Sequence, residues 1–338
     1  MDTMFRYKKL SQKMFDSIAN KNPEVYIPLA QTPQWTAFDE LMPGRDVQGV
    51  FAYYDDEDRL MCTARIDIWT KKMRKYLNID QGPVWFVEPS EKKEIEFAET
   101  IKDQFLNKEK TGVMYLRCQL NHQIPGAVLP FETTTYDRAM YIDITPDEKA
   151  LLKSFKADAR QAIRKAGRIG VEVREIPLDE RVEFFEKNLA DLMDETQQRN
   201  NFRAHPTEVY TNMLKAFPEE ARLYVAFLDE EPISWLISTE YRGHAVYLYA
   251  AGGDKARKNF ASYALQWYCI KEMKERGNKV WDMTGITCKT FPGLENVTVF
   301  KRKFSKWEVQ LPITYDIVFN KLKYKAVGAA TNARRKLL

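Results

Sequence analysis

The sequence predicts a mixed α/β fold arranged in two domains. The chain has 338 residues, about twice the length of a common domain. Segments with the two-residue period of strands alternate along it with segments that have the period of amphipathic helices. Hydrophobic residues make up 44% of the chain, which is enough to build two cores and excludes a disordered or fibrous protein.

The first half is predicted to contain a strand hairpin, a helix and two more strands. Residues 47–54 form a strand, the acidic run 55–58 turns the chain, and residues 60–69 pair back with the first strand. The later elements of this half are a charged helix at 91–108 and strands at 113–118 and 136–144. We place the domain boundary near residue 145, after the last of these strands.

The second half opens with a helix at the domain boundary. Thr145 is the expected N-cap, Pro146 takes the first helical position, and Glu148 completes a capping box. Gly167 and Gly170 end this helix. The elements that follow are strands at 223–228, 233–239, 245–250 and 279–283 and a helix at 259–276. A helical tail rich in lysine and arginine closes the chain.

Charge, cysteine and histidine content exclude several classes of protein. The chain carries 52 Lys and Arg against 48 Asp and Glu, so any contact with nucleic acid needs a local basic patch. No stretch approaches the roughly 18 apolar residues that a membrane span needs. No apolar segment follows the charged start, and we therefore expect a cytoplasmic protein. The four cysteines form no Cys-x-x-Cys pair and the three histidines are far apart, which predicts neither a metal site nor a disulfide framework.

A basic stripe runs along the helix predicted after residue 145. Its members, at spacings of three, four and four residues, share one helix face: Lys153, Lys156, Arg160 and Arg164. Such a stripe is either a solvated surface or a site for phosphates, of RNA or of a nucleotide-linked substrate. The pattern alone leaves both interpretations open.

Three further segments carry candidate chemistry. Lys301 lies beside an apolar helix face that includes Phe300, and it either offers a positive charge to a developing oxyanion or extends along that face to water. The polar segment 197–206 is dense in hydrogen-bond donors and is either a binding loop or a solvated connection. The Gly252-Gly253 turn matches no phosphate-binding loop of known spacing and is interpreted as an ordinary turn.

Taken in order, these segments resemble the FemABX family of non-ribosomal peptidyltransferases. The family's basic helix and the strand after it are matched at 163–173. Its later motifs are matched by Arg203 to Tyr210, Tyr247 to Gly252, Leu265-Gln266-Trp267, Asp282-Met283-Thr284-Gly285-Ile286 and Phe300 to Phe304. A Gln31…Trp35 element matches in the first half, so the resemblance covers most of the chain.

The resemblance implies two tandem acetyltransferase-like (GNAT-like) domains without the coiled-coil arm of larger members. Only residues 176–218 lie between the strands where that arm is inserted. In the short, armless, FemX-like members the last helix returns to the first domain. The expected domains are therefore 1–144 with 314–338, on the precursor side, and 145–313.

The resemblance also implies the reaction. An amino acid passes from aminoacyl-tRNA to the side-chain amine of the stem peptide in a peptidoglycan precursor, UDP-MurNAc-pentapeptide or lipid II, and builds the interpeptide bridge. Aminoacyl-tRNA is the co-substrate, and no cofactor is expected. The enzyme is expected to be a monomer with peripheral contact to the inner membrane face. The alternatives are a GNAT-like aminoacyltransferase acting on a protein N-terminus or a small amine, and a non-catalytic binding or immunity protein.

The same resemblance assigns roles to individual residues. Lys301, with the backbone around Phe300, is expected to stabilise the oxyanion. The residues expected at the precursor are Gln31, Trp35, Arg203, His205, Tyr210 and Tyr249. The residues expected at the tRNA are Lys153, Lys156, Arg160 and Arg164. No metal ligand is expected.

The sequence departs from the family pattern at two places. Thr36-Ala37-Phe38-Asp39 follow Trp35, where members often have a lysine that contacts the precursor's phosphates. Cys118 and Gln119 follow Arg117, where short members can carry an aspartate, so we propose no carboxylate base there. Acetyl-CoA is disfavoured as well, because the segment 164–169 lacks the second glycine of a CoA-binding loop and follows a helix.

Overall fold

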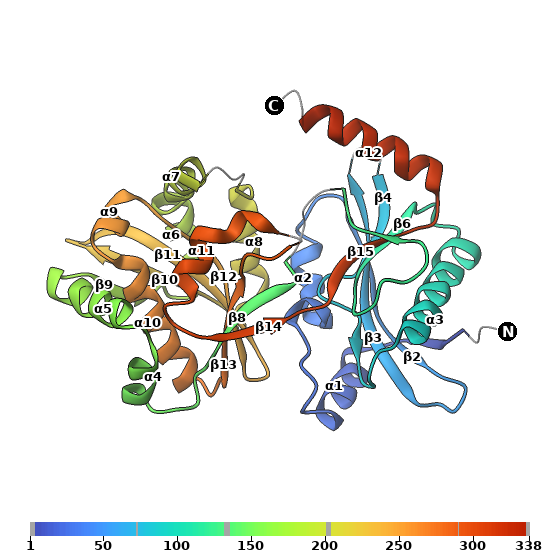
Figure 1. The fold of residues 1–338 in the computed structure, drawn as a ribbon, viewed down its shortest axis with the longest axis horizontal. Coiled ribbons are helices and arrows are strands. Elements are labelled where there is room, and N and C mark those ends of the chain that lie inside the picture. Colours follow the sequence, from blue (N-terminus) through green and yellow to red (C-terminus); the bar gives the residue numbers. More distant parts are fainter. Residues whose placement is uncertain (1–3, 72–73, 132–135, 201–203, 290, 336–338) are drawn as a thin grey trace. The chain divides into compact units, whose positions relative to one another are not determined.

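The computed structural model describes residues 4–71, 74–131, 136–200, 204–289 and 291–335 (Figure 1). The chain divides into two compact units, each built on its own sheet. Unit 1 comprises Met1–Asp137 and Leu311–Leu338, and unit 2 comprises Arg138–Gln310. The two GNAT-like domains expected from the sequence correspond to two separate α/β units.

Unit 1 contains a sheet in the strand order β1-β2-β3-β4-β6-β15-β7, with β5 paired to β3. Its strands are β1 (Arg6–Lys9), β2 (Arg45–Tyr54), β3 (Leu60–Lys71), β4 (Arg74–Asn78), β5 (Val84–Trp85), β6 (Tyr115–Leu120), β7 (Ala127–Val128) and β15 (Ile313–Val318). The predicted hairpin is confirmed, because β2 and β3 pair antiparallel from Arg45↔Trp69 to Tyr54↔Leu60. The pair β4 and β6 is parallel.

The helices of unit 1 pack on both faces of its sheet. They are α1 (Gln12–Lys21), α2 (Thr36–Asp39), α3 (Glu91–Lys102) and α12 (Lys321–Arg335), and α3 continues into a π-helical turn at Asp103–Lys108. Phe97, Ile101 and Phe105 from α3 and this turn are fully buried in one core with the sheet. Figure 1 shows α3 lying along this sheet. The helix predicted at 91–108 therefore corresponds to α3 together with the π-helical turn.

Unit 2 contains a second sheet in the order β14-β8-β13-β12-β11-β10-β9. Its strands are β8 (Arg138–Asp143), β9 (Glu172–Glu175), β10 (Ala221–Leu228), β11 (Glu231–Tyr241), β12 (His244–Gly252), β13 (Val280–Gly285) and β14 (Trp307–Gln310). Its helices are α4 (Glu148–Ser154), α5 (Ala157–Ile169), α6 (Arg181–Asn188), α7 (Ala190–Asn200), α8 (Thr207–Ala216), α9 (Asp254–Lys258), α10 (Ala261–Glu275) and α11 (Glu295–Lys301). The predicted pairing of 223–228 with 233–239 is confirmed by β10 and β11.

Helices pack on both faces of the unit 2 sheet. Leu236 of β11 belongs to the core that holds α5 and α10. Its neighbour Trp235 points to the other face, where its ring lies 4.9 Å from that of Phe185 on α6 and 5.4 Å from that of Tyr210 on α8. The alternation of side chains along a strand explains how one strand serves both layers.

The domain boundary lies earlier than predicted. The strand expected at 136–144 was assigned to the first domain, yet β8 pairs antiparallel with β13 and β14 and so belongs to the sheet of unit 2. Both partners lie more than a hundred residues further along the chain. The boundary was predicted from local sequence patterns, and these contain no information about strand pairing over such a separation.

The helix predicted from residue 145 is two helices. Asp147, not Thr145, caps α4, and its side chain accepts the Ala150 N–H at 2.8 Å. The chain becomes extended at Phe155 and at Lys156, where α5 begins. Phe155 is buried between the rings of Trp267 and Phe304, at centroid distances of 5.8 and 5.2 Å. This packing requires a chain direction that a continuous helix cannot supply.

Candidate functional site

The site in unit 2 begins where two parallel strands part. β12 and β13 are paired only from His244↔Val280 to Val246↔Asp282. Beyond this point β12 remains paired with β11 up to Gly252, whereas β13 pairs with β8. Among the described residues, no further ladder pair joins β12 to β13, so the two strands part beyond Val246 and Asp282.

Lys301 reaches into this region from the last residue of α11. Its Nζ donates to the Gly285 carbonyl at 2.6 Å and to Thr284 Oγ1 at 3.2 Å, and it lies 6.0 Å from the ring centroid of Tyr247. Lys301 is 3% exposed. The lysine therefore does not extend along an apolar face to water, which was the alternative interpretation of its position.

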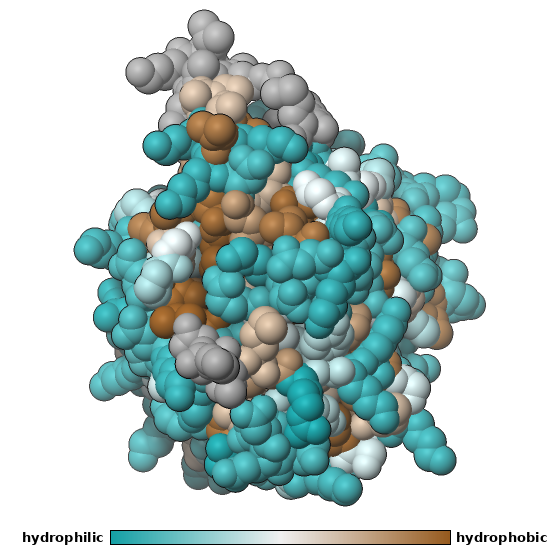
Figure 2. Space-filling view, turned by 90° about the vertical axis from the view of Figure 1, so that its right-hand side faces the viewer, coloured by the Kyte–Doolittle hydropathy of each residue, from teal (hydrophilic) through white to brown (hydrophobic). Residues whose placement is uncertain are grey.

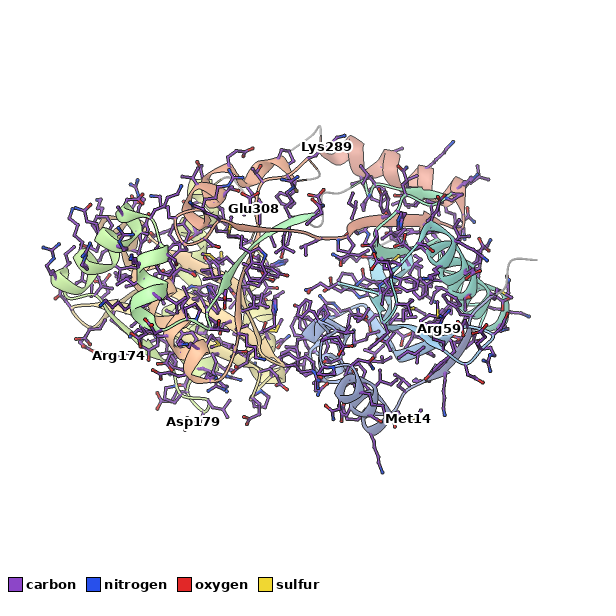
Figure 3. The ribbon with its side chains drawn as sticks, turned by 60° about the horizontal axis from the view of Figure 1, so that its bottom comes forward. Met14, Arg59, Arg174, Asp179, Lys289 and Glu308 are labelled. Atoms are coloured by element: carbon purple, nitrogen blue, oxygen red, sulfur yellow. The ribbon has the colours of Figure 1, made fainter. Side chains whose placement is uncertain are left out.

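Two ion pairs hold the chain that follows Lys301. Arg302 Nε lies 2.7 Å from Glu308 of β14, which Figure 3 labels, and Lys303 Nζ lies 2.9 Å from Asp158 of α5. The half-buried ring of Phe300 packs on Tyr263 and Phe304, and its carbonyl accepts the Lys303 N–H at 3.0 Å. Residues on both sides of Lys301 are thereby fixed.

A β-bulge in β13 presents the groups that Lys301 contacts. Asp282 lies opposite Tyr141 and Gly285 lies opposite Ala139, so β13 has one residue more than β8 between these pairs. Thr284 takes the left-handed φ of 62°. Bulges of this kind redirect side chains next to functional sites.

The environment of Lys301 changes its titration. Burial lowers the pKa of Lys301 to about 7, and the negative charge of Asp282 opposes that shift. Among the described residues no carboxylate lies within ion-pair distance of its Nζ. The charge expected at Lys301 is therefore not permanent: the amine gains and loses its proton near neutral pH.

Three of the predicted precursor residues come together. The ring of Tyr249 on β12 lies 5.7 Å from that of His205 and 5.1 Å from that of Tyr210. His205 is exposed and Tyr249 is half-buried. Tyr210 is buried, and burial raises the pKa of its phenol to about 12. Arg203, another of the six residues predicted at the precursor, lies outside the described residues.

Gln31 and Trp35 are buried in unit 1. Gln31 is 1% exposed; its Oε1 accepts the Arg65 N–H at 2.9 Å, and its Nε2 donates to the Asp80 carbonyl. Both ends of the amide are thus used within the fold. Trp35 is buried against Phe38, with ring centroids 5.3 Å apart. The precursor contact predicted for Gln31 is replaced by a structural role.

The basic stripe does not form one helix face. Lys153 belongs to α4 and Lys156 to the break before α5, so the spacing of three residues between them does not describe a helix. Arg160 donates to the carbonyls of Lys153 and Phe155 at the end of α4, which makes it part of the turn. Lys153, Lys156 and Arg164 are exposed. These three remain available to a polyanion.

Sequence reasoning missed the groups that surround Lys301. Tyr141 and His244 were assigned no role, although Tyr141 lies opposite Asp282 in the register of β8 and β13 and His244 Nε2 lies 3.6 Å from Asp282 Oδ2. The Asp282-x-x-Gly285 motif, which was quoted only as part of the family resemblance, was the sequence signal that could have pointed to these groups. Among the described residues no cluster of His, Cys, Asp and Glu is suited to a metal ion.

These features agree with a match to a known family. The FemAB family model matches residues 126–234 and 229–332, which together include the Lys301 region. The chain belongs to the FemAB family. The crystal structure of a FemX superposes with a TM-score of 0.73 at 13% identity, covering 96% of this chain and 100% of the other. No match was found among curated proteins.

Other solved structures share the FemAB protein's fold at lower similarity. L-PGS from Bacillus licheniformis has a TM-score of 0.54 at 13% identity, and the match covers 95% of this chain and 97% of the other. A tandem GNAT protein from the clavulanic acid biosynthesis pathway has a TM-score of 0.52 at 10% identity and covers 92% and 96%. The fold is therefore two tandem GNAT-like domains, and this FemAB protein is an acyltransferase by family.

Surface character adds one further finding. In the described part of the chain no helix has the length and apolar character to cross a membrane. The face of the molecule in Figure 2 is mostly hydrophilic, with apolar side chains visible between the polar ones.

Proposed function

We propose that this FemAB protein transfers an aminoacyl group from aminoacyl-tRNA to the side-chain amine of the stem peptide in a peptidoglycan precursor. The observation that carries the proposal is Lys301, buried next to the place where β12 and β13 part, within a chain of the FemAB family. The similarity to FemX over the whole chain supports it. Aminoacyl-tRNA serves as co-substrate, and no cofactor is proposed.

The enzyme has two main tasks in this reaction: it aligns the amine with the ester carbonyl, and it supplies a positive charge to the oxyanion. The aminoacyl ester is already activated: the amine nitrogen bonds to the carbonyl carbon, the ester C–O bond breaks, and the departing tRNA hydroxyl takes a proton. The enzyme must hold the amine about 3–3.5 Å from the carbonyl and stabilise the tetrahedral oxyanion. Lys301 supplies that charge in its protonated form, and its pKa of about 7 makes this form accessible at neutral pH.

The two substrates are proposed to use different surfaces. His205 and Tyr249, whose rings lie 5.7 Å apart at β12, contact the precursor. Arg203 is assigned to the precursor by the family resemblance alone. Lys153, Lys156 and Arg164 contact the tRNA phosphates. Since the family lysine after Trp35 is absent and Gln31 is occupied within the fold, the phosphates of UDP-MurNAc-pentapeptide have fewer partners in unit 1.

Incubation with charged tRNA and UDP-MurNAc-pentapeptide, followed by mass spectrometry of the precursor, tests the proposal. We expect the precursor to gain the mass of one aminoacyl residue. Lipid II in detergent is the parallel acceptor, and gain there alone identifies the membrane-bound form. Label found instead on a protein N-terminus or a small amine favours the alternative aminoacyltransferase, and no transfer to any acceptor favours a non-catalytic protein.

A further inference from the structure

Asp282 joins the groups that surround Lys301. Its Oδ1 accepts the N–H of Thr284 at 2.6 Å, which closes a short turn across the bulge of β13. Tyr141 lies opposite Asp282 in the register with β8, and burial, and after it the charge of Asp282, raises the pKa of its phenol. His244 Nε2 lies 3.6 Å from Oδ2. Asp282 is itself buried, at 8% exposed.

The turn closed by Asp282 determines what Lys301 contacts. In a regular strand, consecutive residues point to opposite faces. At the bulge the left-handed Thr284 breaks that alternation, so its hydroxyl and the next carbonyl, that of Gly285, both meet Lys301 Nζ. A β-branched residue rarely adopts this backbone conformation, and the hydrogen bond from Thr284 N–H to Asp282 helps to hold it there.

Asp282 is also the source of negative charge next to Lys301. The other titratable groups in this region are Tyr247 on β12, whose ring faces Nζ, and His244 and Tyr141, which lie behind Asp282. Burial raises the pKa of Tyr247 to about 12 and raises the pKa of Tyr141 further, so both phenols are neutral at physiological pH. The charge of Asp282 raises the pKa of Lys301 against the effect of burial.

We propose that Asp282 is a positioning residue for aminoacyl transfer, which fixes the bulge that holds Lys301 and supplies the negative charge that faces its ammonium group. The inference rests on the proposed function for its effect on catalysis. Its effect on Lys301 itself is measurable without any substrate. The effect of Asp282 on Lys301 and the proposed function can therefore be refuted independently of each other.

The direct test is the titration of Lys301 in the Asp282→Asn variant. Asparagine keeps an oxygen that accepts the Thr284 N–H and removes the charge. We expect the midpoint of Lys301, followed by NMR of the side-chain carbon in protein labelled with [13C]lysine, to fall by about one pH unit, a tenfold loss of proton affinity. The Lys301 signal is assigned by its absence in Lys301→Met.

The matched control is Asp143→Asn, which removes the same charge from the exposed end of β8, where solvent screens it. We expect this control to leave the Lys301 midpoint unchanged. An identical midpoint in wild type and Asp282→Asn overturns the proposal, and so does an equal shift in the Asp143→Asn control.

The catalytic arm uses the pH profile of transfer. The alkaline limb of kcat should move down in Asp282→Asn by the shift measured for Lys301, while the KM for the precursor stays unchanged. In Asp282→Ala, which also lacks the acceptor for Thr284 N–H, we expect kcat to fall at least about tenfold below Asp282→Asn. An unmoved limb, or equal kcat in the two variants, contradicts the positioning role. If wild type transfers nothing, the function proposed above fails, and the NMR result still decides the link between Asp282 and Lys301.

Discussion

Two of the buried cations, Arg65 of unit 1 and Lys301 of unit 2, differ in how their charge is compensated. Arg65 of unit 1 is 1% exposed and lies between two carboxylates, 2.7 Å from Asp39 Oδ2 and 2.5 Å from Asp67 Oδ2. Lys301 of unit 2 is 3% exposed and contacts a hydroxyl and a carbonyl, with Asp282 acting from beyond ion-pair distance. A buried charge is costly unless it is paired, so the difference separates a structural network from a group whose charge can change.

The compensated network shifts pKa values on its acidic side. Burial, and after it the nearby charge of Asp39, raises the pKa of Asp67 above its usual range, although Arg65 opposes the shift. Arg45 adds a second cation that pairs with Asp39. The charges in this part of unit 1 hold α2 against β3 and leave little for a ligand to bind. In unit 2, by contrast, it is the buried cation, Lys301, whose pKa is shifted.

The largest effect is expected from breaking the compensated network. Arg65→Met leaves Asp39 and Asp67 buried without their shared partner, and we expect it to lower the free energy of unfolding by about 3–5 kcal/mol. Urea denaturation followed by circular dichroism measures this. Arg59→Met is the control, because Arg59 is exposed and pairs with Asp55 on the surface, where the loss is about 0–1 kcal/mol. Equal losses in the two variants would show that burial does not distinguish them.

The uncompensated lysine should make stability depend on pH. Its folded pKa of about 7 lies below the usual 10.5, so between these values the folded state binds fewer protons than the unfolded state. Lys301 therefore contributes a rise in the free energy of unfolding of about 1.4 kcal/mol per pH unit from pH 7 to 10.5. Lys301→Met should abolish this contribution while Arg65→Met keeps it. Urea titrations across this range compare them, and an unchanged slope in Lys301→Met contradicts the assigned pKa.

A smaller effect is expected at the aromatic cluster. His205→Ala removes an exposed donor beside Tyr249 and should weaken the binding of UDP-MurNAc-pentapeptide roughly tenfold, as loss of a hydrogen bond to a charged group does. Lys187→Ala, an exposed change on α6 outside this cluster, should leave the affinity unchanged. Calorimetry measures both variants. Unaltered affinity in His205→Ala would remove this residue from the precursor site.

The smallest effect is expected on the surface of α5. Reversing Lys156 and Arg164 to Glu should weaken charged-tRNA binding and reduce its salt slope by about 0.7 for each lost phosphate contact. Arg160 is left intact because it contacts carbonyls at the end of α4. The variant with both Lys149→Glu and Lys187→Glu, two exposed changes on α4 and α6, is the control with the same change in net charge. Filter binding across salt concentrations gives the slopes, and equal slopes in wild type and in the variant of Lys156 and Arg164 would assign these two residues to a solvated surface.

Local patterns predicted the elements of the fold better than their partners. The strands at 47–54 and 60–69 were predicted correctly, because two-residue alternation and an acidic turn are encoded within the segment itself. The place of β8 in the second sheet depends on β13 and β14, which no local pattern reveals. The break at Phe155 likewise depends on packing against Trp267 and Phe304.

The candidate site was predicted in part for the same reason. The resemblance placed Lys301, His205, Tyr210 and Tyr249 in one domain, and the structure brings the last three together. Lys301 is buried where the bulge at Thr284 presents its contacts, and burial lowers its pKa to about 7. The Asp-x-x-Gly motif alone does not predict this bulge. We predicted a substrate contact for Gln31 because the sequence does not reveal its partners in the fold. These partners, the backbone of Arg65 and of Asp80, are distant in sequence.

In the proposed reaction, Lys301 supplies the positive charge that stabilises the oxyanion during aminoacyl transfer. The most direct test of this role is the rate at which wild type and Lys301→Met transfer an amino acid from charged tRNA to UDP-MurNAc-pentapeptide, with the product measured by mass spectrometry. We predict that the variant loses about 10²–10³-fold in kcat, as expected for removal of an oxyanion partner, while its affinity for the precursor is unchanged. A variant that turns over within a few-fold of wild type would contradict the account.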